Sequence, residues 1–156
     1  MILVLLGTVP NNFDRLLIEV DRIAKKSKKK FIVQLGNSKY KPKNVSFFNF
    51  KNKEKILEYI KKAEIIISQG GFGSLYDCLQ NRKKVVAVPR LKRFNEHATE
   101  HQMELVEALE KKGRIIAVYS IEDLESAIQK AYAFQPNNPE IHQIPELVRE
   151  FIENNI

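Results

Sequence analysis

The chain has 156 residues, of which 44% are hydrophobic and 29% charged, and it carries a formal net charge of +7. A chain of this length can bury a core without covalent staples, and its single cysteine excludes internal disulfides and favours a reducing compartment. The opening apolar run, residues 2–6, is too short for a signal peptide or a membrane span, so we expect a soluble cytosolic protein.

The positive charge is concentrated in the first part of the chain. Residues 1–62 carry 15 of the 26 lysines and arginines but only 5 of the 19 acidic residues. This part can face phosphates, an acidic partner or an anionic membrane surface, and it can equally be a set of solvated lysines. No nucleic acid partner is predicted, because the lysines of residues 25–30 end a helix and no aromatic-glycine signature of an RNA-binding sheet accompanies them.

Buried-strand patterns alternate with helical spacing along the chain. Strands are predicted at residues 1–6, 31–35, 45–50, 63–67, 84–88 and 114–119. Helices are predicted at residues 13–26 and 53–62, from the following glycines to about residue 80, from about 103 to 113, and at 121–134. This alternation predicts one α/β domain over residues 1–135, with a parallel sheet covered by helices on both faces.

Residues 136–156 are predicted to form a separate element. The sequence Pro-Asn-Asn-Pro at 136–139 breaks the pattern, and an amphipathic helix follows from about Ile144 to Glu153. Its apolar stripe must be buried, either on the same domain or, as a docking element, on a second chain.

Residues 68–74, Ser-Gln-Gly-Gly-Phe-Gly-Ser, place three glycines at a strand-to-helix turn. A helix N-terminus offers free N–H groups and a positive dipole end, and glycine lets a phosphate approach the backbone. The phosphate-site candidates are Gly70, Gly71, Phe72, Gly73 and Ser74. Asp77, one turn farther, can accept hydrogen bonds from a ribose. The alternative is a tight turn in which Ser74 caps the helix and Asp77 completes a capping pair.

Other loops also fall at the carboxyl ends of predicted strands, where open parallel sheets bind ligands. They contain Gly7 and Thr8, Gly36 and Asn37, and the segment 89–102. In that segment Glu96, His101 and Gln102 are read as hydrogen-bonding groups for a polar ligand, or as a solvated helix start.

Charged and metal-ligating side chains in segment 89–102 allow two further readings. Arg90 and Arg93 can add positive charge near a diphosphate or lie solvated at the surface. His97 and His101 are four residues apart and would share a helix face if the helix began early enough. Zinc needs at least three protein ligands, and no third one has a supporting spacing, so neither a metal nor another cofactor is predicted.

Several of these motifs together resemble the C-terminal domain of glycosyltransferase family 28, over nearly the whole chain. The motifs are Gly7-Thr8 with residues 13–16, Gln-Leu-Gly-Asn-Ser at 34–38, residues 68–74, and Val-Pro-Arg at 88–90 with Asn-Glu-His at 95–97 and Glu-His-Gln at 100–102. The sequence is most similar to the small cytosolic subunits of two-chain UDP-sugar transferases of lipid-linked oligosaccharide assembly, and to their bacterial exopolysaccharide counterparts.

The resemblance implies the Rossmann-like C-terminal half of a GT-B glycosyltransferase. It implies a donor-binding subunit of an inverting hexosyltransferase that uses UDP-GlcNAc or a UDP-hexose. A membrane-anchored partner chain would supply the general base and the lipid-linked acceptor, and would hold this chain at the cytosolic membrane face. On the family pattern, residues 71–74 would bind the diphosphate, Asp77 the ribose, and His101 with Gln102 the donor sugar. Gln69 stands where split subunits often have His.

Two other functions remain open at this stage. The chain can be a non-catalytic activator subunit that binds a nucleotide sugar and raises the rate of a partner transferase. It can also be an α/β nucleotide-binding regulator without a sugar substrate. Selectivity for uridine over adenine nucleotides separates the regulator from the other two, and reconstitution with a partner separates those two.

Overall fold

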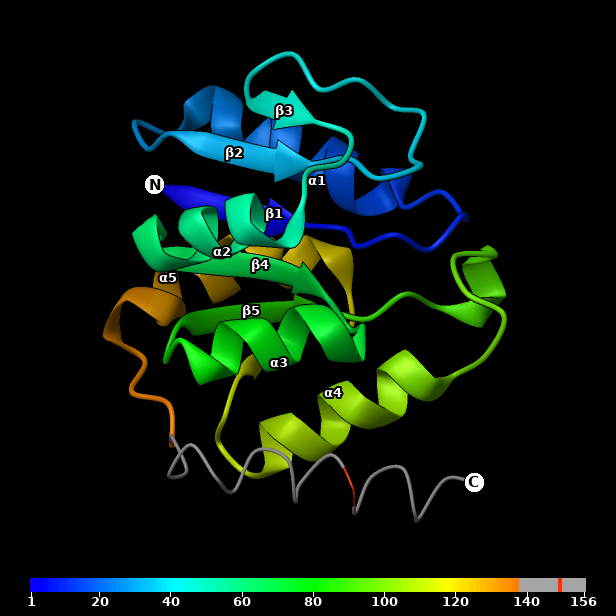
Figure 1. The fold of residues 1–156 in the computed structure, drawn as a ribbon, viewed down its shortest axis with the longest axis vertical. Helices are drawn as coiled ribbons and strands as arrows, with labels where there is room; N and C mark the ends of the chain where they lie inside the picture. Colours follow the sequence, from blue (N-terminus) through cyan, green and yellow to red (C-terminus); the bar gives the residue numbers. More distant parts are fainter. Residues whose placement is uncertain (138–148, 150–156) are drawn as a thin grey trace.

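The structure is a computed structural model that describes residues 1–137 and 149. The described residues form a six-stranded parallel sheet in the order β3-β2-β1-β4-β5-β6 (Figure 1). The strands are β1 Ile2–Leu5, β2 Phe31–Gln34, β3 Ser46–Phe48, β4 Ile65–Gln69, β5 Lys84–Val88 and β6 Ile116–Ala117. This is the strand order of the doubly wound Rossmann fold.

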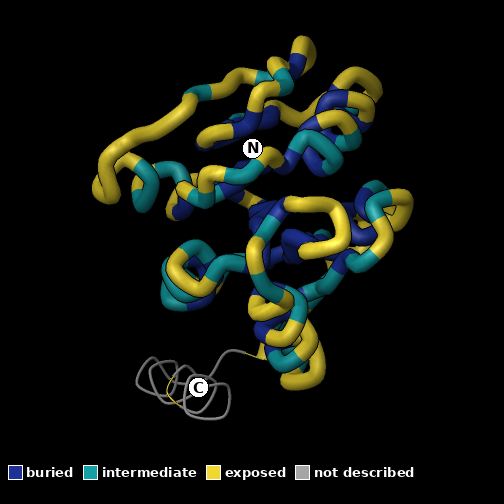
Figure 2. Tube along the Cα trace, turned by 90° about the vertical axis from the view of Figure 1, so that its right-hand side faces the viewer, coloured by how far each residue is buried: buried dark blue, intermediate teal, exposed yellow. Residues whose placement is uncertain are grey.

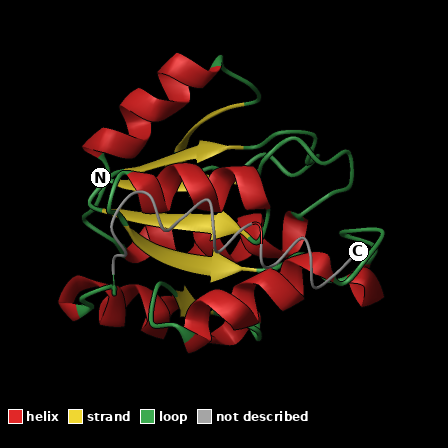
Figure 3. Cartoon of the chain, turned by 60° about the horizontal axis from the view of Figure 1, so that its bottom comes forward, coloured by secondary structure: helices red, strands yellow, loops and turns green. Residues whose placement is uncertain are grey.

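Helices cover both faces of the sheet, as Figures 1 and 3 show. The helices are α1 Asp14–Lys26, α2 Lys53–Lys62, α3 Phe72–Gln80, α4 His101–Lys111 and α5 Leu124–Ala133. Short 3-10 turns at Lys92–Phe94 and Ile121–Asp123 precede α4 and α5. Helices α1 and α5 pack on one face, and α2, α3 and α4 pack on the other. The predicted fold class is therefore confirmed.

The sheet separates two hydrophobic clusters because successive side chains of a strand point to opposite faces. In β1, Ile2 and Val4 join the cluster under α1 and α5, whereas Leu3 and Leu5 join the cluster under α2, α3 and α4. All four residues of β1 are buried, as expected for a central strand covered on both faces. Figure 2 shows the buried strands between more exposed helices and loops.

Strands β1, β2 and β3 are shorter than predicted by one or two residues at an end, and β4 and β6 differ most from the sequence-based prediction. Strand β4 runs to Gln69, because Ser68 and Gln69 pair with Ala87 and Val88 of β5. The glycine turn is correspondingly shorter. Strand β6 has only two residues, where residues 114–119 were predicted, because only Ile116 and Ala117 pair with β5.

The division into residues 1–135 and 136–156 stays a prediction. The helix predicted from about Ile144 to Glu153 lies outside the described residues, apart from Arg149. Among the helices that the structure does describe, none has the length and apolar composition needed to cross a bilayer.

Candidate functional site

The strand order reverses between β1 and β4, and this switch point is where open α/β sheets bind ligands. A cleft of about 270 Å³ lies there, between the ends of β1 and β4 and the helices α2 and α3. Its lining residues are Leu5, Gly7, Thr8, Val9, Gln34, Ile56, Ile60, Gln69, Gly73, Ser74 and Asp77. The cleft thus brings together Gly7, Thr8, Gly73, Ser74 and Asp77 of the predicted site.

The N-terminus of α3 opens onto this cleft. Gly71 is the N-cap residue, no described side chain caps the helix, and its first turn carries no acidic residue. The N–H groups of Phe72, Gly73 and Ser74 occupy the first helical positions, which have no acceptor one turn earlier in the helix. The positive end of the helix dipole adds to these donors. The first turn of α3 therefore has the geometry of an anion site.

Packing explains two of the three glycines in this turn. A Cβ on Gly71 would collide with Nε2 of Gln69, and a Cβ on Gly70 would lie 2.9 Å from both Gln102 Cβ and Val106 Cγ2. Neither of these two glycines lines the cleft. They let the chain pass close to buried side chains.

Gly73 has no such packing reason. A Cβ placed on it meets no described atom within 4 Å, and the residue lies inside the first turn of α3. Glycine inside a helix costs about 0.5–1 kcal/mol relative to alanine. Because Gly73 has no side chain, its backbone is uncovered on the side of the cleft. A ligand that contacts the backbone closely requires this.

Asp77 lies one turn farther along α3 and lines the cleft. Its carboxylate Oδ1 is 3.3 Å from Nζ of Lys53, and the two side chains are 16% and 72% exposed. The prediction that Ser74 caps the helix with Asp77 as its capping partner is wrong, because α3 already begins at Phe72 with Gly71 as its cap. Asp77 is free of any capping role and is accessible from the cleft.

The loops after β1 and β2 are tied to one another. Gly7 and Gly36 both have positive φ, 72° and 57°, which favours glycine. A Cβ on Gly36 would lie 2.5 Å from the carbonyl oxygen of Gly7. The Gly7 N–H donates to Gln34 Oε1 at 3.2 Å, and Asn37 Nδ2 donates to the carbonyl of Thr8 at 3.2 Å. Asn37 therefore stabilises the loop after β1, which lines the cleft.

Phe72, also predicted for the site, exposes 45% of its surface and is not a lining residue of the cleft. Its ring lies 5.6 Å from that of Tyr76, one turn along α3. The structure thus places Phe72 at the first helical position of α3 but does not bring it into the lining of the cleft.

The side chain of Gln102 forms a hydrogen bond with the glycine turn. Its Oε1 accepts hydrogen bonds from the N–H groups of Gly70 and Arg90, both at 3.0 Å, and its Nε2 donates to Gln69 Oε1 at 2.6 Å. Gln102 is buried, so its amide group makes these hydrogen bonds with protein groups in place of water. Gln102 thereby connects α4 to the ends of β4 and β5.

Among the residues that the structure describes, Arg90 is the largest fully buried side chain, with 1% exposure. Its guanidinium donates to the carbonyls of Leu6, Asn11 and Glu96 and to Gln69 Oε1. Burial lowers the pKa of this guanidinium to about 10, although the Glu96 carboxylate opposes the shift. The predicted placement of Arg90 at a diphosphate is not what the structure shows, because all these contacts are internal.

Glu96 is also buried, and its carboxylate forms a two-pronged ion pair with Arg15 of α1, at 3.0 and 2.9 Å. Its Oε1 also accepts the Leu91 N–H at 3.0 Å. Glu96 therefore joins the loop after β5 to α1. Like Arg90 and Gln102, it can influence a ligand only through the loops that it holds.

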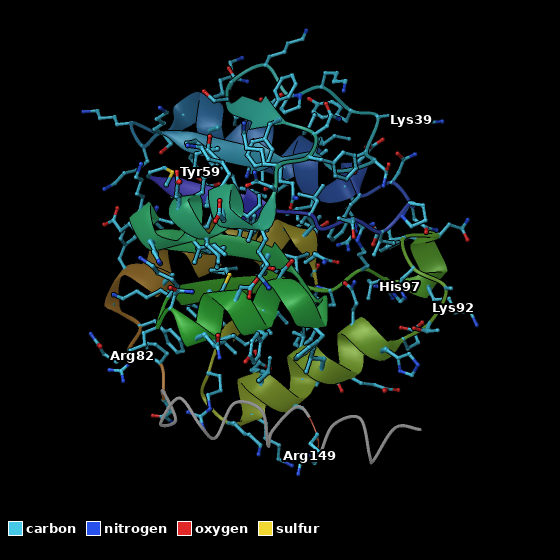
Figure 4. The ribbon with its side chains drawn as sticks, in the orientation of Figure 1. Lys39, Tyr59, Arg82, Lys92, His97 and Arg149 are labelled. Carbon is cyan, nitrogen blue, oxygen red and sulfur yellow. The ribbon has the colours of Figure 1, made fainter. Side chains whose placement is uncertain are left out.

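The two histidines do not share a helix face, because α4 begins only at His101. His97, labelled in Figure 4, lies in the preceding loop, and its Nδ1 accepts the Thr99 N–H at 3.1 Å. His101 is exposed, with Nδ1 3.4 Å from Glu104 Oε2. The condition for a shared helix face, an earlier start of the helix, is therefore not met. No group of three potential metal ligands occurs among the described residues.

Sequence reasoning did not assign three residues that shape the site. Gln34 and Gln69 end strands β2 and β4 and line the cleft, and both are buried. A polar residue at the end of an apolar strand was the available signal. No sequence signal distinguishes Lys53, because it is one of many lysines in its part of the chain.

The fold and the cleft define a Rossmann-type α/β domain with a helix N-terminus, free of side-chain caps among the described residues, at its switch point. The model of the glycosyltransferase family 28 C-terminal domain matches residues 1–152. The chain belongs to this family, which confirms the resemblance drawn from the motifs.

Two curated relatives are both named UDP-N-acetylglucosamine transferase subunit ALG13. The protein from Homo sapiens is 32% identical over 91 residues, and the one from Candida albicans is 29% identical over 89 residues. These matches cover 55% and 57% of this chain. They cover only 8% and 29% of the two relatives, so most of each relative has no counterpart in the match.

Solved structures share the fold at low sequence identity. A solution structure of ALG13 has a TM-score of 0.64 at 14% identity, covering 97% of this chain and 94% of that chain. The glycotransferase of kitacinnamycin has 0.63 at 16% identity, and UDP-GlcNAc 2-epimerase from Neisseria meningitidis, bound to UDP-GlcNAc, has 0.58 at 17%. This chain covers 40% and 44% of the latter two. In both, the shared fold is less than half of the molecule.

Proposed function

We propose that this chain is the donor-binding subunit of a glycosyltransferase that transfers a sugar from a UDP-sugar, UDP-GlcNAc or a UDP-hexose. The observation that carries the proposal is the first turn of α3, where the N–H groups of Gly73 and Ser74 meet the cleft beside Asp77. Membership of the family and the names of the two ALG13 relatives support it.

Each part of the cleft would have one task. The N–H groups of the first turn of α3 would bind the diphosphate, with the Gly73 backbone in close contact. The Asp77 carboxylate would accept hydrogen bonds from the two ribose hydroxyls. Lys53 is mostly exposed at the mouth, and its ammonium would turn from Asp77 to a phosphate oxygen when the donor binds.

The proposed reaction is a direct displacement that inverts the anomeric carbon. A hydroxyl of the acceptor forms a bond to the anomeric carbon of the sugar, and the bond from that carbon to the diphosphate oxygen breaks. Negative charge then grows on the departing UDP, where the N–H groups and dipole of α3 would stabilise it more strongly than in the ground state. The general base that takes the proton of the acceptor hydroxyl would come from a partner chain.

A partner is part of the proposal because the cleft is small. Its volume of about 270 Å³ is below the roughly 300–1,000 Å³ of most ligand pockets, so it accommodates only part of a nucleotide sugar. A second, membrane-anchored chain would cover the sugar and bring a lipid-linked acceptor, and it would hold this chain at the cytosolic membrane face.

The first experiment is a calorimetric titration of the full chain with UDP, with ADP as the comparison. We expect UDP to bind more tightly than ADP, and Asp77→Ala to weaken UDP binding about 10- to 100-fold, because the ribose loses a charged hydrogen-bond acceptor. Asp123→Ala, at an exposed position, is the matched control and should bind like the wild type. Equal binding of the two nucleotides would contradict a UDP-sugar transferase.

Reconstitution with the partner distinguishes a catalytic donor half from the activator subunit. In a donor half, Asp77→Ala should abolish sugar transfer at donor concentrations that saturate the wild type. An activator would lose only its stimulation, and the partner's own transfer rate would persist. Transfer by the partner alone would therefore favour the activator.

A further inference from the structure

Residues 39–55 connect β2 to α2 around the edge of the sheet and contain strand β3 (Figure 1). They carry six lysines, four aromatic residues and one acidic residue, Glu54. We call the exposed lysine and phenylalanine side chains of residues 39–55 the β3 surface. Figure 2 shows long exposed stretches at this end of the molecule, and Figure 4 shows Lys39 there.

The positive charge of the β3 surface is only weakly neutralised. Among the described residues, Lys39, Lys41, Lys43 and Lys51 form no ion pair with an acidic side chain. Their side chains are all exposed. Such a cluster attracts an anionic surface within about a Debye length, about 8 Å at physiological salt.

Exposed phenyl rings lie among these lysines. Phe47 is 43% exposed and Phe50 is 50% exposed. Lysines flanking the edge strand β3 would alone be explained by protection against edge-to-edge aggregation, which requires no exposed aromatic residue. The phenylalanines need a second explanation, and a partner that accepts both ammonium groups and apolar rings supplies one.

Lysine ammonium groups lie over several of the rings. Lys41 Nζ is 5.8 Å from the centre of the Phe47 ring, and Lys51 Nζ is 5.1 Å from that of Phe48. The Phe48 ring also stacks on the ring of Tyr59 in α2, with ring centres 5.5 Å apart. The faces of Phe47 and Phe48 are therefore partly covered, which disfavours the stacking of nucleic acid bases. Phenyl edges flanked by ammonium groups suit the headgroup region of a bilayer, where lysines meet phosphates and rings enter the acyl boundary.

We propose that the β3 surface binds the headgroups of anionic phospholipids, so that this chain contacts a membrane directly and not only through a partner. The β3 surface adjoins the candidate site, because Lys53 lies within residues 39–55 and forms the ion pair with Asp77. A membrane bound here would thus lie beside the donor cleft. The proposal does not depend on the proposed function, since lipid binding needs no donor, acceptor or second chain.

The test is flotation of the full chain with vesicles of equal parts phosphatidylcholine and phosphatidylglycerol, with pure phosphatidylcholine vesicles alongside. We expect binding to the anionic vesicles only. The triple variant Lys41→Gln, Lys43→Gln, Lys51→Gln should bind about 100-fold more weakly, since each lysine near an anionic surface contributes about a fivefold factor. Retained binding by this triple variant would overturn the proposal.

The matched control is Lys25→Gln, Lys28→Gln, Lys30→Gln, which removes the same charge from exposed lysines in the last turn of α1 and just after it. These lysines lie where β2 begins, whereas residues 39–55 follow its end. The control should keep its affinity within about threefold if the β3 surface is the contact. Equal losses in the two triple variants would mean attraction by net charge alone and would also overturn the proposal.

A tryptophan reporter tests the aromatic part, because the chain contains no tryptophan. Phe50→Trp should show a blue-shifted emission with anionic vesicles and quenching by brominated lipid. Tyr132→Trp, at the end of α5, should show neither. An unchanged Phe50→Trp emission would contradict ring insertion. If a uridine oligonucleotide bound in place of vesicles and the first triple variant lost that binding, the partner would be RNA and the membrane proposal would fail.

Discussion

The side-chain oxygen of Gln102 accepts a hydrogen bond from the N–H of Gly70, at 3.0 Å, and so links α4 to the glycine turn before α3. The same oxygen accepts the N–H of Arg90, at 3.0 Å. One buried amide therefore fixes two loops that follow neighbouring strands, β4 and β5. The position of the α3 N-terminus at the cleft depends on a residue that does not line the cleft.

The first prediction concerns this amide. Gln102→Ala should lower the free energy of unfolding by about 2–4 kcal/mol, because it leaves two buried N–H donors without an acceptor. Urea unfolding followed by circular dichroism measures the change. Gln129→Ala, at an exposed position on α5, should change stability by less than about 0.5 kcal/mol. A loss below about 1 kcal/mol at position 102 would mean that water replaces the amide.

The second prediction concerns Arg90 and Arg93, for which the sequence alone predicts the same role. Arg90→Lys should destabilise the protein by about 2–4 kcal/mol, because an ammonium cannot reach the carbonyls of Leu6 and Asn11 and Gln69 Oε1 at once. Arg93→Lys, at an exposed position, should stay within about 0.5 kcal/mol. Urea unfolding of both variants is the measurement, and equal effects would contradict the structural role of Arg90.

Local sequence was sufficient to predict most of the fold. Apolar runs of strand length and apolar residues at helical spacing indicate the elements whichever partners they find, and α2 was predicted at residues 53–62, as observed. The ends of β4 and β6 could not be predicted, because pairing with β5 decides them. The alternative in which Ser74 caps the helix is wrong for a related reason. Several residues of the turn suit a cap, and the packing of Gly70 and Gly71 selects an earlier start.

The candidate site was predictable only where its residues are close in sequence. Gly73, Ser74 and Asp77 belong to one turn and one helix, so their proximity follows from helical geometry. Arg90, Glu96 and Gln102 have polar side chains that composition places at the surface, yet all three are buried. Their burial is stable because Gln69, Arg15 and backbone groups from distant segments satisfy them, and such contacts leave no local pattern.

The third prediction is a pH dependence at Asp21 of α1. Burial alone would raise the pKa of this carboxyl, but hydrogen bonds from the backbone N–H groups of Asn44 and Lys43 and from the Tyr40 hydroxyl lower it overall. A lowered pKa in the folded state contributes stability above the unfolded-state pKa of 3.8, and this contribution is lost as the pH falls through the folded-state value.

Asp21→Asn should therefore destabilise the protein more at about pH 7 than at about pH 3, because pH 3 lies below the unfolded-state pKa, where the stability contributed by the lowered pKa is already reduced. The expected loss near neutral pH is about 1–2 kcal/mol, because the charged acceptor of several hydrogen bonds becomes a neutral amide. Urea unfolding at both pH values measures it, and Asp123→Asn, at an exposed position, should show no such difference. A pH-independent loss would contradict the role of the charge.

The last prediction separates the binding role of a glycine from its structural role. Gly73→Ala should raise the free energy of unfolding by about 0.5–1 kcal/mol, because alanine favours the helix and its Cβ meets no described atom within 4 Å. The same methyl group would occupy the space that a diphosphate needs at the first turn of α3, so UDP binding should weaken at least tenfold. Calorimetry and urea unfolding of one variant give both values.

Gly71→Ala is the matched comparison for Gly73→Ala. Its Cβ would collide with Gln69 Nε2, whose side chain is held by Arg90 and Gln102, so this variant should lose stability. A variant that gains stability while losing affinity identifies a position kept as glycine for a ligand, and Gly73 should be such a position. If Gly73→Ala kept full affinity for UDP, the diphosphate would not approach this backbone, and the anion site at α3 would have to be abandoned.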